Sequence, residues 1–157
     1  MSKSATVNVM CQVHEKGNWS AHAKKLQACL QSAYATHTRG QDSLRCIWAN
    51  IPEGQGWLAG HISTASTILL PVPDDITQVE RVNMMTQICD DWMEITGCSV
   101  DEIIVNAMPK SEAKKYFALA FTRFDPDRGT RFKLRLGLRL LWSKIVKGYF
   151  TTSTNLP

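Results

Sequence analysis

The sequence predicts an α+β fold in which two consecutive βαβ units form a four-stranded sheet with two helices on one face. Three observations support this prediction. Four short segments have the alternating or apolar composition of strands, and each pair of them encloses a stretch with helical apolar spacing. The second half also repeats the spacing of the first at an offset of 59 residues, which places Thr6 on Ala65 and Leu44 on Ile103.

The first unit begins with a strand over 6–13, where apolar and polar residues alternate. A helix follows from residue 18 or 20, because apolar residues then recur every three or four positions. The residues on this apolar side are Trp19, Ala23, Leu26, Leu30 and Ala33. A mostly apolar strand over 43–50 closes the unit, and we expect its two strands to lie parallel with a right-handed crossover.

The second unit begins with a strand over 64–72. Thr77 is expected to cap a helix that ends just before Gly97, and the fourth strand is expected over 102–107. The residues expected on the buried side of this helix are Val82, Met85, Cys89, Trp92 and Ile95. Because both helices lie on one face of the sheet, the other face needs cover, and assembly of several copies is the simplest way to provide it.

Charge is distributed unevenly along the chain, whose net charge is +4. Residues 1–127 contain 14 acidic and 11 basic groups, whereas residues 128–157 contain seven basic groups and no acidic one. We therefore expect one domain over 1–127, with its two halves at about 6–60 and 64–117, and a basic extension over 128–157.

Two patterns overlap in the basic extension. Residues 131–140 alternate as an edge strand would, yet Leu134, Leu138, Leu141, Trp142 and Ile145 also mark one side of a helix over 130–145. Leucine, arginine and lysine favour helix, so we predict a helix that docks on the domain. Docking on a homotrimer ranks first among its roles and contact of 128–147 with an anionic membrane surface second. Nucleic acid binding ranks last, because aromatic residues for base stacking are sparse.

The composition contains no signal for a metal or a cofactor. Five cysteines on mostly apolar segments are typical of buried free thiols in a reducing compartment, and no Cys/His pair has the spacing of a zinc site. No apolar run reaches the roughly 18 residues that a membrane span needs, and the first residues do not resemble a signal peptide. We predict a cytoplasmic protein with no metal and no cofactor.

Two stretches carry a specific pattern: SLRCIWAN followed by IPEGQGWLAG, and TGCSVDEIIVNAMPKSEAKKYF. The first resembles the second strand and glycine-rich hairpin of short members of the tautomerase superfamily, which includes 4-oxalocrotonate tautomerase and macrophage migration inhibitory factor. The second resembles the fused, cis-3-chloroacrylic acid dehalogenase-like branch, including a Met-Pro pair and a tyrosine seven residues after that proline. The resemblance covers about Thr6 to Phe117 and implies a homotrimer with pockets where subunits meet.

The resemblance also implies a site that moves a proton on a 2-oxo or enol carboxylate, with an amino-terminal proline as the base. Thr6 occupies the position of this proline, but five residues precede it and its nitrogen is an amide, so the expected base is absent. Lys16 and Arg45 match carboxylate-binding positions, and Trp57 matches the aromatic wall of the pocket. Tyr116 is retained and is a candidate acid or hydrogen-bond donor.

Each of these residues has an ordinary structural alternative. Arg45 can form a surface or inter-subunit salt bridge, Lys16 can be a solvated loop charge, and Trp57 can pack in the core. Two hypotheses therefore remain. One is an inter-subunit pocket for a small 2-oxo or enol carboxylate, with ordinary tautomerase activity weak or lost. The other is a non-catalytic trimeric binding or structural protein whose basic tail contacts a partner or a membrane surface.

Overall fold

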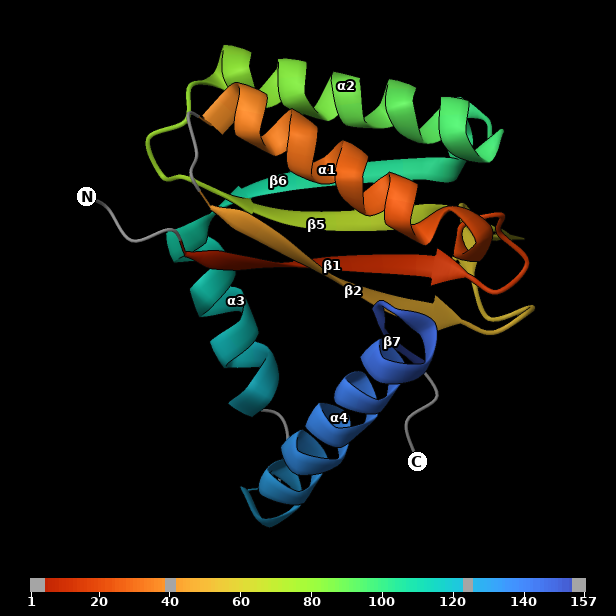
Figure 1. Cartoon of the computed structure of the whole chain (residues 1–157), viewed down its shortest axis with the longest axis vertical. Helices are drawn as coiled ribbons and strands as arrows, with labels where there is room; N and C mark the ends of the chain where they lie inside the picture. Colours follow the sequence, from red (N-terminus) through yellow and green to blue (C-terminus); the bar gives the residue numbers. More distant parts are fainter. Residues whose placement is uncertain (1–4, 39–41, 123–125, 154–157) are drawn as a thin grey trace.

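The computed structural model describes residues 5–38, 42–122 and 126–153. Its main feature is a five-stranded sheet of order β6-β5-β1-β2-β7 (Figure 1). The strands of this sheet are β1 (Thr6–His14), β2 (Ser43–Ile51), β5 (Ser66–Val72), β6 (Ile103–Pro109) and β7 (Phe150–Ser153). The helices are α1 (Ala23–Thr38), α2 (Gln78–Thr96), α3 (Lys110–Thr122) and α4 (Pro126–Lys147). The smaller elements are two 3-10 turns (Ser20–His22 and Val100–Glu102) and a hairpin of β3 (Trp57–Leu58) and β4 (His61–Ile62).

The two predicted βαβ units are present and have the same strand register. Val7 lies opposite Leu44 in the parallel pair of β1 and β2, and Ser66 lies opposite Ile103 in the parallel pair of β5 and β6. Both members of the second pair lie 59 positions after those of the first, so the offset found in the sequence is a structural repeat. The units meet at the antiparallel pair of β1 and β5, which places the ends of β5 and β6 beside the start of β1.

The hydrophobic core lies between the sheet and helices α1 and α2, which cover one of its faces (Figure 1). The apolar side predicted for the first helix is confirmed, because all five of its residues are buried. Beneath this helix, Trp48 of β2 is fully buried. Its ring stacks on Trp19 with centroids 5.2 Å apart and lies 6.0 Å from the ring of Trp92. Three tryptophans therefore join the two units into one core.

The buried side of α2 differs in part from the prediction. Met84, Ile88 and Trp92 are the buried residues of this helix, whereas Val82 is 44% exposed. The prediction for Val82 is wrong. The buried side of α2 consists of residues spaced four apart, beginning at Met84. Val82 precedes Met84 by two positions, which is about 200° around a helix. The other predicted residues of this side are buried or partly buried against the core.

The two ends of α2 are capped as predicted. Glu80 N donates to Thr77 Oγ1 at 3.2 Å, and Thr77 N donates to Glu80 Oε2 at 3.0 Å, which forms a complete capping box. Gly97 ends the helix with a φ of 74°, a conformation that glycine adopts without the steric cost of a Cβ atom.

Replacing Thr77 by alanine should lower the free energy of unfolding by about 1 kcal/mol, because one half of the capping box is lost. Urea denaturation measures this change. Thr36→Ala is the matched control, since the exposed Thr36 hydroxyl donates only to a carbonyl of its own helix, Ser32 O. A loss for Thr77→Ala no larger than that for Thr36→Ala would contradict the capping assignment.

The sheet has a fifth strand that the prediction of four strands did not include. Helix α4 contains the span 130–145 for which a helix was predicted, and Gly148 then turns the chain at a φ of 80°. The four residues of β7 add to the edge of β2 in parallel, with Phe150 opposite Ile47. A four-residue strand is too short to show an alternating pattern, and its position depends on α4 returning the chain to the sheet.

The second face of the sheet is only partly covered by the described residues. The alternation along β1, β2 and β6 turns the exposed side chains of Asn8, Arg45, Ile104 and Asn106 to this face. Helices α3 and α4 leave the sheet on this side and extend away from it (Figure 1). Among the described residues, the length and the hydropathy needed to cross a bilayer are not combined in any helix.

Candidate functional site

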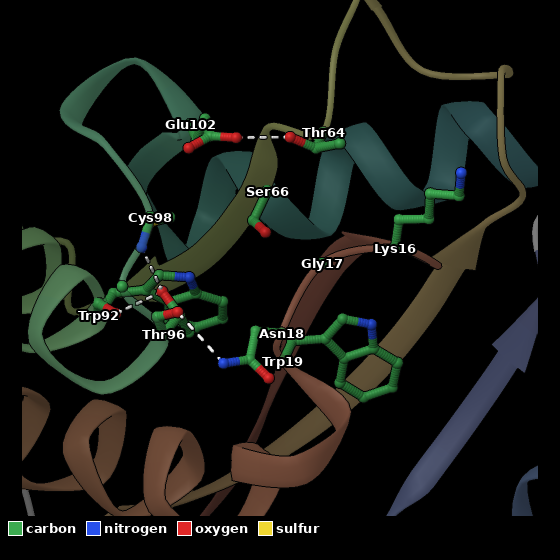
Figure 2. Close-up of a pocket in the computed structure, with 11 residues that line it drawn as sticks. Lys16, Gly17, Asn18, Trp19, Thr64, Ser66, Trp92, Thr96, Cys98 and Glu102 are labelled. Atoms are coloured by element: carbon green, nitrogen blue, oxygen red, sulfur yellow. Dashed lines mark hydrogen bonds between the residues drawn. The ribbon is translucent and has the colours of Figure 1, made fainter.

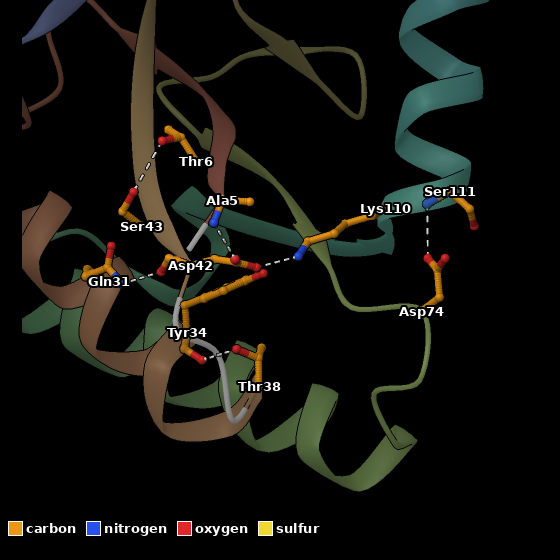
Figure 3. Close-up of polar contacts among 10 residues, drawn as sticks. All are labelled: Ala5, Thr6, Gln31, Tyr34, Thr38, Asp42, Ser43, Asp74, Lys110 and Ser111. Atoms are coloured by element: carbon orange, nitrogen blue, oxygen red, sulfur yellow. Dashed lines mark hydrogen bonds and ion pairs between the residues drawn. The ribbon is translucent and has the colours of Figure 1, made fainter. Parts of the chain in front are cut away.

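The start of β1 is the position where the resemblance places a titratable amine. Thr6 is the first residue of β1, and its hydroxyl lies 3.4 Å from the hydroxyl of Ser43 (Figure 3). The preceding amide, Ala5 N, donates to Asp42 Oδ1 at 3.0 Å. The backbone at this point is therefore continuous and hydrogen-bonded. It supplies no amine that could accept a proton from a substrate.

Asp42 also forms an ion pair with Lys110, whose Nζ lies 2.6 Å from Asp42 Oδ2. The two residues come from opposite units, because Asp42 precedes β2 and Lys110 follows the last residue of β6. Figure 3 shows both side chains converging below Ala5, with Tyr34 of α1 beside them. We call Ala5, Tyr34, Asp42 and Lys110 the Asp42 cluster.

Each titratable group of the Asp42 cluster is held in one protonation state at neutral pH. The hydrogen bond from Lys110, followed by that from Ala5, lowers the pKa of Asp42, so its carboxyl group is ionised. Desolvation, the largest single effect, would lower the pKa of Lys110. The hydrogen bond to Asp42 and the interactions with Tyr34 together outweigh it, so the pKa is raised and the amine stays protonated. Burial raises the pKa of the Tyr34 phenol, which keeps its proton. The cluster therefore lacks the poised base that proton transfer requires.

Lys16 and Trp57 lie at the opposite end of β1 from Thr6. Lys16 Nζ is 2.5 Å from Glu53 Oε1 in an ion pair whose side chains are both 62% exposed. Trp57 is 64% exposed in the hairpin, and its Nε1 donates to Gly54 O at 3.2 Å. A nine-residue strand is about 26 Å long at about 3.3 Å per residue, so these residues cannot meet Thr6 within one chain.

Arg45 lies on the strand next to Thr6, two residues after its register partner Ser43, whereas Tyr116 lies on α3. Arg45 is exposed on the open face of the sheet, opposite Asn8 in the strand register, and its guanidinium lies 5.5 Å from the Phe150 ring centroid. Tyr116 is 56% exposed on α3, with its ring edge-on to Phe117. The five residues proposed from the sequence therefore do not form one site in a single chain.

The glycine-rich turn after β2 closes over a buried histidine. His14 is 2% exposed, and its Nδ1 accepts from Lys16 N at 3.3 Å. A Cβ atom on Gly56 would lie 2.6 Å from Ser63 O and 3.2 Å from His14 Cδ2, so only glycine fits at this position. The turn thus has a packing role that brings the hairpin carrying Trp57 against the end of β1. The position of His14 at the end of an alternating strand gave no sign of this burial.

A polar cavity of about 200 Å³ opens at the start of β5, the structural repeat of the start of β1 (Figure 2). Its lining includes Lys16, Trp19, Ser66, Cys98 and Glu102. Glu102 Oε1 accepts from Thr64 Oγ1 at 2.6 Å, and this bond, followed by those from Ser99, lowers the pKa of the carboxyl group. Of the five residues proposed from the sequence, Lys16 alone lines this cavity. The offset of 59 residues could have indicated this cavity from the sequence, because Ala65, just before β5, is the repeat of Thr6.

No protein-family model matches this chain, and no curated protein matches it. Solved structures do share its fold. The alignment with native Ps01740 has a TM-score of 0.61 at 17% identity and covers 65% of this chain and 92% of that one. A fused 4-OT symmetric trimer gives 0.56 at 12% identity, covering 66% of this chain and 87% of that one. Malonate semialdehyde decarboxylase gives 0.52 at 14% identity, covering 64% and 82%. About a third of this chain lies outside each of these alignments.

Proposed function

We propose, on the premise that this chain has the tautomerase-superfamily fold, that it is a homo-oligomeric binding protein for a small 2-oxo or enol carboxylate. In this proposal the ligand is held between subunits, and ordinary tautomerase activity is weak or lost. The observation that carries it is the start of β1, where Ala5 N is bonded to Asp42 and Asp42 is paired with Lys110. A backbone amide bonded in this way cannot serve as the base that the fold otherwise places there.

Two features support assembly of several copies. One face of the sheet exposes Ile104 and polar residues. No described helix packs along this face as α1 and α2 pack along the opposite face. A structure with the same fold, fused 4-OT, is a trimer. Thr6 and Trp57 of one chain lie at opposite ends of β1. In an oligomer, Thr6 of one copy and Trp57 of another can line the same pocket.

Arg45 is the residue best suited to hold the carboxylate. It is exposed, its guanidinium has no carboxylate partner among the described ion pairs, and the Phe150 ring lies 5.5 Å away. A guanidinium can bind a carboxylate with two parallel hydrogen bonds, which a lysine cannot do. Lys16 is less suited, because Glu53 already pairs with it. Trp57 offers an exposed aromatic surface for the apolar part of a ligand.

Replacing Arg45 by alanine should weaken binding of small 2-oxo carboxylates at least about tenfold, because a charge-assisted hydrogen bond contributes about 1.5–3 kcal/mol. Isothermal titration with pyruvate and 2-oxoglutarate measures this change, with sedimentation velocity on the same samples to report assembly. Lys25→Ala is the matched control, since it removes one exposed positive charge from α1 on the covered side of the sheet. Binding that is absent in the native protein, or equal in the native protein and Arg45→Ala, would overturn the proposed ligand class.

A further inference from the structure

Helix α4 presents an apolar side to solvent. Five residues at helical spacing form it, and each is at least 59% exposed: Leu134, Leu138, Leu141, Trp142 and Ile145. We call these five residues the α4 stripe. They are the residues that the sequence predicted to dock on the domain, yet in a single chain they contact no part of it that would bury them. A contiguous apolar patch that is exposed on a protein surface indicates a binding function.

The side of α4 that does contact the domain is a different one. Ser143 is 8% exposed, and its hydroxyl accepts from Thr151 N of β7 at 2.9 Å and donates to Leu140 O at 2.8 Å. Ser143 lies five residues after Leu138, which is about 140° around the helix. Most of the α4 stripe therefore points away from β7, whereas Trp142, next to Ser143 in the sequence, borders a cavity between α4 and Thr151 of β7. The helix extends away from the sheet (Figure 1).

The α4 stripe is bordered by positive charge. Arg131, Arg135 and Arg139 are exposed and recur at four-residue spacing along one edge of it. Residues 128–157 contain seven basic groups and no acidic one, whereas the rest of the chain has a net charge of −3. A helix with an apolar side, an exposed tryptophan and a basic border has the chemistry of segments that lie in the interface of an anionic bilayer.

We propose that α4 binds the surface of anionic lipid membranes, with the α4 stripe inserted between headgroups and the arginine row facing lipid phosphates and carboxylates. This inference is independent of the proposed carboxylate site. An anionic bilayer matches both the apolar and the basic character of the helix. Pairing of the α4 stripe with that of a second copy would bring two basic segments without acidic residues together, which is electrostatically unfavourable.

The attachment of α4 allows it to bind as a preformed helix. Its last turn is tied to the sheet through β7, and Lys144 Nζ donates to Gly148 O at 2.8 Å. A helix that is already folded does not have to order its backbone on the membrane, unlike a disordered peptide. The contacts with β7 involve the last turns of α4 and leave most of the α4 stripe exposed to solvent.

The test uses the full-length protein and sedimentation with two kinds of vesicle, pure phosphatidylcholine and phosphatidylcholine with about 30% phosphatidylserine. We expect pelleting with the anionic vesicles, little with the neutral ones, and release at about 1 M salt, where the Debye length falls to about 3 Å.

The double variant Arg135→Glu with Arg139→Glu should bind at least about tenfold more weakly, since each basic residue near the surface contributes about 1 kcal/mol. Lys25→Glu with Lys114→Glu is its matched control, because it changes the net charge equally at exposed sites outside α4.

Insertion is measured through Trp142, which is 69% exposed. A Trp57→Phe variant keeps Trp142 and three buried tryptophans, Trp19, Trp48 and Trp92. Acrylamide quenching of this variant therefore reports mainly on Trp142. We expect strong quenching in buffer and protection with anionic vesicles, and Leu138→Glu should abolish the protection. Equal pelleting with both vesicles, or none with either, would overturn the proposal. Protection of Trp142 in buffer alone would also overturn it, because another copy would then cover the α4 stripe.

Discussion

Replacing Trp48 by alanine is expected to lower the free energy of unfolding by about 3–5 kcal/mol, the largest loss that we expect from a single side chain. Trp48 is fully buried, stacks on Trp19 at 5.2 Å and lies 6.0 Å from Trp92. Alanine would leave a cavity where α1, α2 and β2 meet, and a well-packed interior fills such a cavity only in part. A domain of this size has a total stability of about 5–15 kcal/mol, so the variant should be close to unfolding.

Guanidinium denaturation measures this loss, with Trp57→Ala as the matched control. Trp57 is 64% exposed, so its removal should change the free energy of unfolding by less than about 1 kcal/mol. Trp48→Phe should be milder than Trp48→Ala, because it keeps an aromatic ring and removes an indole N–H that has no hydrogen-bond partner among the described residues. Similar losses for Trp48→Ala and Trp57→Ala would show that the tryptophan cluster is not the centre of the core.

A chain that starts at residue 6 with proline is expected to gain tautomerase activity, by about 100-fold or more over the native chain. The change replaces the amide at the start of β1 with a secondary amine. It also removes Ala5, whose amide now bonds to Asp42. The measurement is the ketonisation of phenylenolpyruvate, followed by the loss of the enol absorbance.

Asp42 should limit the gain, because a carboxylate beside an amine favours the protonated form and raises the amine pKa. Adding Asp42→Asn to the proline variant should therefore increase the rate near neutral pH and move the rate profile to lower pH. A chain that starts at residue 6 with alanine controls for the truncation itself. If the proline and alanine chains were equally inactive while folded, a terminal amine at the start of β1 would not be sufficient for activity, and this prediction would be wrong.

The repeated fold was predictable because it depends on local patterns. Apolar spacing identified both helices. The offset of 59 residues, which placed Leu44 on Ile103, recurs in the structure, where Val7 pairs with Leu44 and Ser66 pairs with Ile103. The strand β7 was not predictable in the same way, because four residues carry no periodic signal and their pairing depends on the direction of α4. The buried side of α2 was misplaced at Val82, where several apolar residues allow more than one stripe.

The candidate site was less predictable than the fold. Thr6 was correctly placed at the start of β1, but the groups that close this position were missed. Asp42 and Lys110 are 68 residues apart and meet only because β1 and β5 are antiparallel. Lys16, Arg45 and Trp57 were proposed as one pocket from a resemblance to proteins that assemble. A single chain keeps them apart, so their joint role rests on oligomer geometry that local sequence patterns do not contain.

We infer that the native chain has no working base at the start of β1, because the nitrogen of Thr6 is a peptide amide. The most direct test of this inference is the ketonisation rate of phenylenolpyruvate with the full-length protein between about pH 5 and pH 9, the range in which a tuned amine would titrate. Mass spectrometry of the same sample must show that the residues before Thr6 are present. We predict a rate indistinguishable from buffer at every pH. Turnover by the intact chain that rises with pH and disappears in Arg45→Ala would show that a working base is present.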